Sequence, residues 1–130
     1  MSQIKEIFTP DVLKNLFPSQ RTDDFFEALF GDAADGAYDI EVKFVNDDLA
    51  AKKIYFELHL IERPRKCLAC NLTYGLPEVF SRHPVINING LVADIDKQLG
   101  DIATTKSWKL EHTRQDSNEL HIIPLVIDLE

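Results

Sequence analysis

Both cysteines of the chain lie three residues apart, in a segment that is also rich in basic side chains. Cys67 and Cys70 form a Cys-x-x-Cys motif, and His83 follows after twelve intervening residues. Two thiolates at this spacing can chelate one soft metal ion when the segment folds as a knuckle, because both sulfurs then turn to the same point. The motif therefore predicts a metal site, with zinc as the ion, held by Cys67, Cys70 and His83.

A complete Cys2His2 zinc finger would need a second histidine about three to five residues after His83. Residues 84–89 contain neither His nor Cys, so this class of finger is excluded. A further zinc ligand would have to come from elsewhere in the chain: His59, His112 or His121. The competing interpretation is that Cys67 and Cys70 are small core residues, since cysteine is among the most buried residue types.

The same two thiols could instead carry out redox chemistry. Arg65 and Lys66 directly precede Cys67, and positive charge lowers the pKa of a thiol and favours the reactive thiolate. A thioredoxin-like motif, however, opens a helix that follows a strand, whereas the residues after Cys70 are poor helix formers. A thiol-dependent redox protein or enzyme using these two cysteines is therefore an alternative to a binding function.

Residues 63–84 form a positive island in an acidic protein. The island holds four Lys or Arg against a single acid, Glu78, whereas the rest of the chain holds ten against twenty-one. Arginine forks suit carboxylates and phosphates, and a tyrosine hydroxyl could assist them. The predicted anion-binding residues are Arg63, Arg65, Lys66, Tyr74 and Arg82. The competing interpretation is that the island pairs with the acidic body of its own chain or of a twin subunit.

The composition disfavours several other functions. The net charge is -8, and nucleic acids and anionic membranes both need a cationic surface, so neither is expected as a partner. The sequence contains no glycine-rich phosphate loop, no G-x-S-x-G motif and no H-E-x-x-H motif. No apolar run of about 18 residues predicts a membrane span, and the first residues lack a signal-peptide pattern. We therefore expect a cytoplasmic protein.

Three amphipathic helices are expected to carry the scaffold. They are predicted within residues 9–18, 22–31 and 89–100, where apolar residues recur with helical spacing. Thr9 and Thr22 are typical N-caps for the first two helices. The glycines that close the second and third ranges are typical of a left-handed C-terminal cap.

Period-two alternation predicts the first of two hairpins. In residues 38–44 every even-numbered side chain is apolar and every odd-numbered one is charged, as in a half-buried strand. The Asn-Asp-Asp sequence at residues 46–48 predicts the turn. Residues 54–60 form the return strand, with the even-numbered residues again facing inward and His59 on the wetter face.

A second hairpin is predicted from residues 108–112 and 120–127. The last strand is almost wholly apolar, so it is expected to be buried on both faces or to form a subunit contact. Pro124 cannot donate to a ladder and is expected at an edge or a bulge. His112 and His121 are in register with apolar neighbours and are expected in the core.

The order of these elements favours one fold class. Two helices precede a hairpin, the basic cysteine-bearing segment follows, and a helix and the second hairpin end the chain. This order predicts a single α+β domain over residues 1–130, with an antiparallel sheet built from two hairpins and helices packed on one face.

Four phrases of the chain resemble a known family. They are Ile7-Phe8-Thr9-Pro10, the stretch 25–32, the stretch 36–40 and the stretch 66–77. They resemble a family of small, uncharacterised bacterial proteins, some of which have been labelled as a pancreatic homeobox protein. The resemblance implies a bacterial cytoplasmic protein and carries over no catalytic residue. The homeobox label conflicts with the sequence, because a homeodomain is a basic three-helix unit whereas this chain is acidic and rich in strands.

The leading functional hypothesis is a non-enzymatic binding or regulatory module. Its site would be the segment 63–84, and its ligand a small anion, a metal ion or an acidic partner. One alternative is the thiol-dependent redox protein. Another is a structural homo-oligomer, which the apolar last strand and the phenylalanine-rich first helices suggest.

Overall fold

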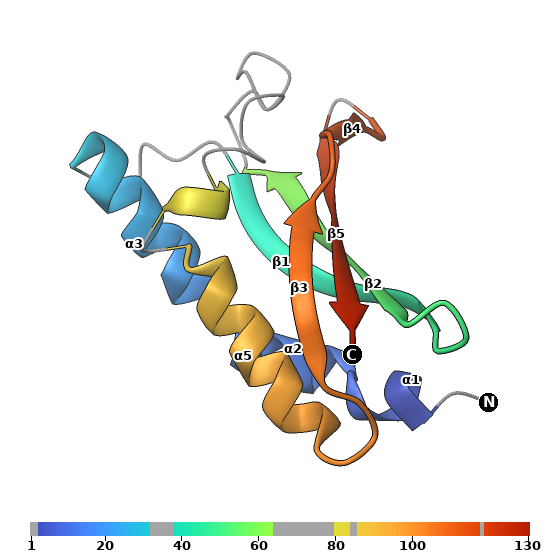
Figure 1. Cartoon of the computed structure of the whole chain (residues 1–130). Helices are drawn as coiled ribbons and strands as arrows, with labels where there is room; N and C mark the ends of the chain where they lie inside the picture. Colours follow the sequence, from blue (N-terminus) through green and yellow to red (C-terminus); the bar gives the residue numbers. More distant parts are fainter. Residues whose placement is uncertain (1–2, 32–37, 64–79, 84–85, 118) are drawn as a thin grey trace.

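The computed structural model describes residues 3–31, 38–63, 80–83, 86–117 and 119–130 (Figure 1). In this part of the chain, helices lie on one side of an antiparallel sheet, which confirms the predicted α+β fold. None of the helices described there is both long enough and apolar enough to cross a membrane.

The helices begin only in part where the sequence predicts, and the first of them was not predicted. Their bounds are α1 (Gln3–Ile7), α2 (Pro10–Leu16), α3 (Ser19–Phe30) and α5 (Ile88–Leu99), and residues 80–82 are also helical. Thr9 caps α2 as predicted: its Oγ1 accepts a hydrogen bond from the Val12 backbone N–H at 3.3 Å. Gly31 ends α3 in the left-handed conformation, with φ 83°.

The predicted start of α3 was wrong. The helix begins at Ser19, so Thr22 lies within it and is not its N-cap. The reason is that Pro18 has an extended backbone, with φ -71° and ψ 154°, and α3 starts directly after it. Thr22 is buried inside the helix, and its Oγ1 has no hydrogen-bond partner within the described residues.

Asn87 sets the start of α5. It has a left-handed backbone with φ 51°, and its Oδ1 accepts a hydrogen bond from the Gly90 N–H at 3.0 Å. A Cβ at position 90 would clash with the Asn87 side-chain nitrogen, so a larger residue there would displace the capping side chain. The predicted inward face of this helix is confirmed, because Leu91, Ile95 and Leu99 are buried.

The sheet places the last strand in its interior. The strands are β1 (Tyr38–Asp48), β2 (Lys53–Glu62), β3 (Thr105–Leu110), β4 (Arg114–Gln115) and β5 (Leu120–Leu129). Their order is β1-β2-β5-β3, all neighbours are antiparallel, and the short β4 also pairs with β5. The two predicted hairpins therefore join through β2 and β5, and β1 and β3 become the edges.

The first turn lies later than predicted. Residues 46–48 belong to β1, and the chain turns at residues 49–52, where Lys52 has φ 60°. A register shift between Phe44 and Asn46 lets the strand continue past the expected turn. Asp48 still has a turn-forming role, because its Oδ1 accepts the Ala51 N–H at 3.0 Å.

Pro124 lies in an interior strand, which corrects the expectation of an edge or a bulge. It pairs with Glu57 of β2, and its carbonyl accepts the Glu111 N–H at 2.9 Å on the other side. The N–H that proline lacks would point to that same side, beyond the last residue of β3. The missing donor therefore costs no hydrogen bond to β2. The expected burial of β5 on both faces is confirmed by Ile122 and Ile123, which point to opposite faces and are both buried.

The two C-terminal histidines differ. His121 is buried, as predicted, whereas His112 is exposed and the prediction of a core position was wrong. The alternation that suggested it stops because β3 ends at Leu110. Beyond that point it is Thr113 that turns inward.

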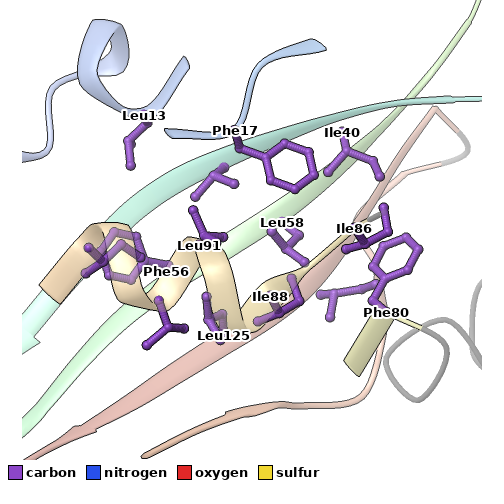
Figure 2. Packing of buried hydrophobic residues seen from close by; sticks show 14 of the residues in the cluster. Leu13, Phe17, Ile40, Phe56, Leu58, Phe80, Ile86, Ile88, Leu91 and Leu125 are labelled. Carbon is purple, nitrogen blue, oxygen red and sulfur yellow. The ribbon is translucent and has the colours of Figure 1, made fainter. Parts of the chain in front are cut away.

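The core lies between the sheet and the helices. Figure 2 shows Leu58 and Leu125 of the sheet among Leu91 and Ile88 of α5, with Phe17 beside Ile40. The even-numbered residues of β1 and β2 and the odd-numbered residues of β5 point to this side. None of the described helices lies on the opposite face of the sheet (Figure 1).

Candidate functional site

Most of the site predicted from the sequence lies outside the described residues. This holds for Arg65, Lys66, Cys67, Cys70 and Tyr74. The described members are Arg63, Arg82 and His83. The zinc, redox and anion hypotheses for this segment therefore stay predictions, which elemental analysis combined with thiol titration and an anion screen would test.

Arg63 forms ion pairs within its own chain. Its Nη2 lies 2.8 Å from Asp23 Oδ1 of α3 and 3.0 Å from Asp39 Oδ1 of β1. The guanidinium carbon also lies 5.3 Å from the centre of the Phe26 ring. The Arg63 side chain is only 16% exposed, so it joins α3 to the start of the sheet. Pairing with acids of the same chain is what the competing interpretation of the basic segment predicts.

Tyr38 lies beside this ion pair. Burial raises the pKa of the Tyr38 hydroxyl, and the nearby positive charge of Arg63 opposes part of that rise. The hydroxyl is therefore neutral at ordinary pH. The Tyr38 ring packs edge-on against Phe26, with 4.8 Å between ring centres. This end of the sheet is consequently a packed aromatic and ionic junction.

His83 lies in an aromatic environment. Its ring is edge-on to Phe25 at 4.8 Å, and Phe80 packs on the same phenylalanine at 5.5 Å. Arg82, which lies between Phe80 and His83 in the sequence, is exposed. Among the described residues, no three His, Cys, Asp or Glu side chains are grouped closely enough to hold a metal ion. The predicted contact of His83 with Cys67 and Cys70 lies outside the described residues.

A groove runs beside the open edge of the sheet, and sequence reasoning missed it. It has a volume of about 450 Å³ and lies between the α2–α3 corner and residues 39–43 of β1. Its apolar lining includes Leu13 and Phe17 from the helices and Ile40 and Val42 from the strand. Figure 2 shows Leu13, Phe17 and Ile40 on this side of the core. The remaining lining is mostly charged: Lys14, Asp39, Glu41 and Lys43.

The backbone of β1 directs hydrogen-bonding groups into this groove. The Glu62 N–H donates to Glu119 across β2 and β5 at 2.8 Å, so the even-numbered residues of β2 turn their backbone groups to β5. In an antiparallel pair, the residues opposite them then turn their own N–H and C=O away from the partner strand. Those residues include Ile40, opposite Leu60, and Val42, opposite Leu58. Their backbone donors and acceptors therefore face the groove.

The walls of the groove are parts of the core. Leu13 is 4% exposed and Phe17 is 3% exposed, because both also pack against the interior. The Thr9 cap and Pro10 set the start of α2, which carries Leu13. The groove is thus a fixed feature of the fold, since closing it would require repacking of buried residues.

The uncovered face of the sheet carries a second polar cluster. Glu57 Oε1 lies 2.9 Å from His59 Nε2, and Glu57 Oε2 accepts a hydrogen bond from Arg114 Nη2 at 3.2 Å. A hollow of about 540 Å³ adjoins it, with Tyr55 in its lining. The cluster connects β2 to β4 across Ile122, which is opposite both His59 and Arg114. Its geometry fits a cross-strand link that shields an apolar residue, and the alternation that put His59 on this face was the signal for it.

The chain was compared with protein-family models, with curated proteins and with solved structures, and none of them matches. The resemblance to small bacterial proteins therefore stays a prediction. The function has to be inferred from the geometry of the described residues.

Proposed function

We propose that the protein is a non-enzymatic binding module that holds an extended segment of a protein partner along β1. The observation that carries the proposal is the groove whose strand side presents the backbone N–H and C=O groups of Ile40 and Val42. An extended peptide placed there adds a strand to the sheet. Main-chain hydrogen bonds then supply affinity, and pockets for alternate side chains supply specificity.

The shape of the groove suits such a segment. A strand added beside β1 directs alternate side chains to the helix side, where Leu13 and Phe17 form an apolar wall. The volume of about 450 Å³ is within the range of ligand pockets, so the groove holds a short stretch of chain. Burial of apolar side chains there stabilises the complex by about 25 cal/mol per Å² of buried surface, before the cost of ordering the peptide.

The groups that line the groove suit binding better than catalysis. The groove offers paired main-chain donors and acceptors, an apolar wall and surface charges. It places no pair of carboxylates in an apolar setting, and none of its described lining residues is a histidine or a cysteine. Recognition is the activity that such groups supply directly.

The test uses a display library of random peptides and amide hydrogen exchange on the protein with a selected peptide bound. The Ile40 and Val42 amides are expected to exchange more slowly, because the peptide accepts their hydrogen bonds. The Glu41 amide, which already faces β2, is expected to change little.

The matched variants are Val42→Pro and Val42→Ala. Both lose the valine side chain, but only proline also removes the N–H that faces the groove. Val42→Pro is expected to lose peptide binding, and Val42→Ala to retain most of it. Selected peptides that bound Val42→Pro as tightly as the unaltered protein would contradict the proposal.

A further inference from the structure

The charges along β1 restrict which extended segment can bind, and this inference rests on the proposed function. Asp39, Glu41 and Lys43 alternate with the buried residues of β1 and lie on the face away from the helices. In an antiparallel strand added at this edge, the residue opposite Glu41 belongs to a pair without main-chain hydrogen bonds. The side chains of such pairs approach most closely, with Cα atoms about 4.5 Å apart. The charge of Glu41 therefore acts directly on one position of the partner.

The existing contacts of these acids leave them accessible. Glu41 lies 3.5 Å from Lys43, and both side chains are about two-fifths exposed, at 40% and 42%. Asp39 is 52% exposed although Arg63 contacts its Oδ1. The Glu41–Lys43 pair, with both partners exposed, contributes little to stability, so it can rearrange at small cost. A basic side chain on the partner strand gains contact with Glu41, and its neighbour two residues away gains contact with Asp39.

The charge of the whole molecule acts in the same direction. The chain carries a net charge of -8, which draws a basic segment toward it and repels an acidic one. A second copy of the chain would carry the same -8. Pairing of two β1 edges about a two-fold axis would also bring both α2 helices to one face above neighbouring strands. Such strands lie about 4.8 Å apart, whereas packed helices need about 8–10 Å.

We infer that the partner segment is a strand in which apolar residues alternate with basic ones. Its apolar residues enter the groove beside Leu13 and Phe17, and its basic residues face Asp39 and Glu41 on the other side of the sheet. Lys43 limits this preference to one end of the site, so the partner position that faces Lys43 is neutral or acidic.

The experiment compares two capped octapeptides that carry valine at alternate positions. One has lysine and the other glutamate at the positions between, and the dissociation constants are measured by calorimetry at low and high salt. The lysine peptide is expected to bind about tenfold more tightly, and the ratio is expected to fall at high salt. Glu41→Lys is expected to reduce or invert the preference, and Val42→Pro is expected to abolish binding of the lysine peptide.

Each outcome separates the inference from the proposed function. Equal binding of both peptides, with protection of Ile40 and Val42, would overturn the charge preference and leave strand addition standing. Tighter binding of the glutamate peptide would do the same. Failure of both peptides to bind, or binding that survives Val42→Pro, would overturn strand addition at this edge. A dimer that light scattering detects and that Val42→Pro dissociates would identify a second copy as the occupant and overturn the inference.

Discussion

The two edges of the sheet differ in how far they can accept another strand. β3 has six residues, a register shift between Thr105 and Ser107, and lysines at positions 106 and 109. Its Trp108 Nε1 donates to Asn89 Oδ1 of α5 at 2.8 Å, which ties this edge to a helix. Short length, irregular register and lysines are the features by which proteins prevent unwanted strand pairing.

β1 lacks most of these features along the groove. It has eleven residues, its register with β2 is uniform from Tyr38 to Phe44, and the irregularity comes only after Phe44. The regular part coincides with residues 39–43, which line the groove. In the described part of the chain, the β3 edge therefore has features that hinder strand addition, whereas the β1 edge is open where a pocket adjoins it. The difference supports the proposal that this stretch of β1 binds a partner strand, because a long regular edge is otherwise a liability.

The largest expected effect comes from the strand that supports the open edge. Leu58 of β2 is fully buried and lies between Val42 of β1 and Ile123 of β5. Leu58→Ala is expected to lower the free energy of unfolding by about 2–5 kcal/mol, because it leaves a cavity in the core. Urea unfolding measures the change. The control is Val45→Ala, at a position that is 46% exposed, where a change within about 0.5 kcal/mol is expected.

An intermediate effect tests the direction of the β1 backbone groups. Glu41→Pro removes an N–H that faces β2, whereas Val42→Pro removes one that faces the groove. Relative to alanine at the same position, proline is expected to cost about 1–3 kcal/mol more at position 41 and little at position 42. Chemical unfolding of the four variants measures this. Equal proline costs at the two positions would show that β1 is not open along the groove.

The smallest expected effect concerns His121 of β5, a strand that is not adjacent to β1. Burial lowers the pKa of His121 from its ordinary 6.5, so the unfolded chain binds the proton more readily than the folded one. The stability from neutral His121 is present above pH 6.5 and is lost as the pH falls through its folded pKa. Unfolding at about pH 7.5 and about pH 5.5 measures the loss.

The variants His121→Gln and His112→Gln separate this contribution from that of an exposed histidine. The first is expected to reduce the pH dependence and the second to leave it. His121 pairs with Gln115 of β4, so faster amide exchange at low pH is expected in β4 and β5. Exchange in β1 that rose just as much would contradict the expected difference between the β1 edge and strands β4 and β5.

Much of the fold could be predicted because the signals are local. The Thr9 cap, the left-handed Gly31 and the alternation of Tyr38 to Phe44 depend on neighbours within a few residues. The turn was misplaced where a distant contact overrides a local preference, whereas the errors at Thr22 and His112 concerned where an element begins or ends. Turn formers at 46–48 continue β1 because β2 pairs with them, and the pattern that suggested a core His112 ends where β3 ends.

The candidate site shows the same division. The segment 63–84 was predicted as a site from its residue types alone. The structure shows that Arg63 in this segment is paired with two acids, which lie 40 and 24 positions away in the sequence. The groove gave no sequence signal beyond the charges at 39, 41 and 43. Its existence depends on α2 lying beside an edge strand, which no spacing of residue types encodes.

By itself, the sequence determined most of the longer elements, the Thr9 and Gly31 caps and the buried face of β1 and β2, because these follow from backbone preferences and from the burial of apolar side chains. Only the tertiary structure decided that β5 lies between β2 and β3 and that β1 is left at an edge. That choice depends on pairing between residues such as Leu58 and Ile123, far apart in the chain. The edge position of Ile40 and Val42, on which the proposed function rests, is therefore known only once the order of the strands is known.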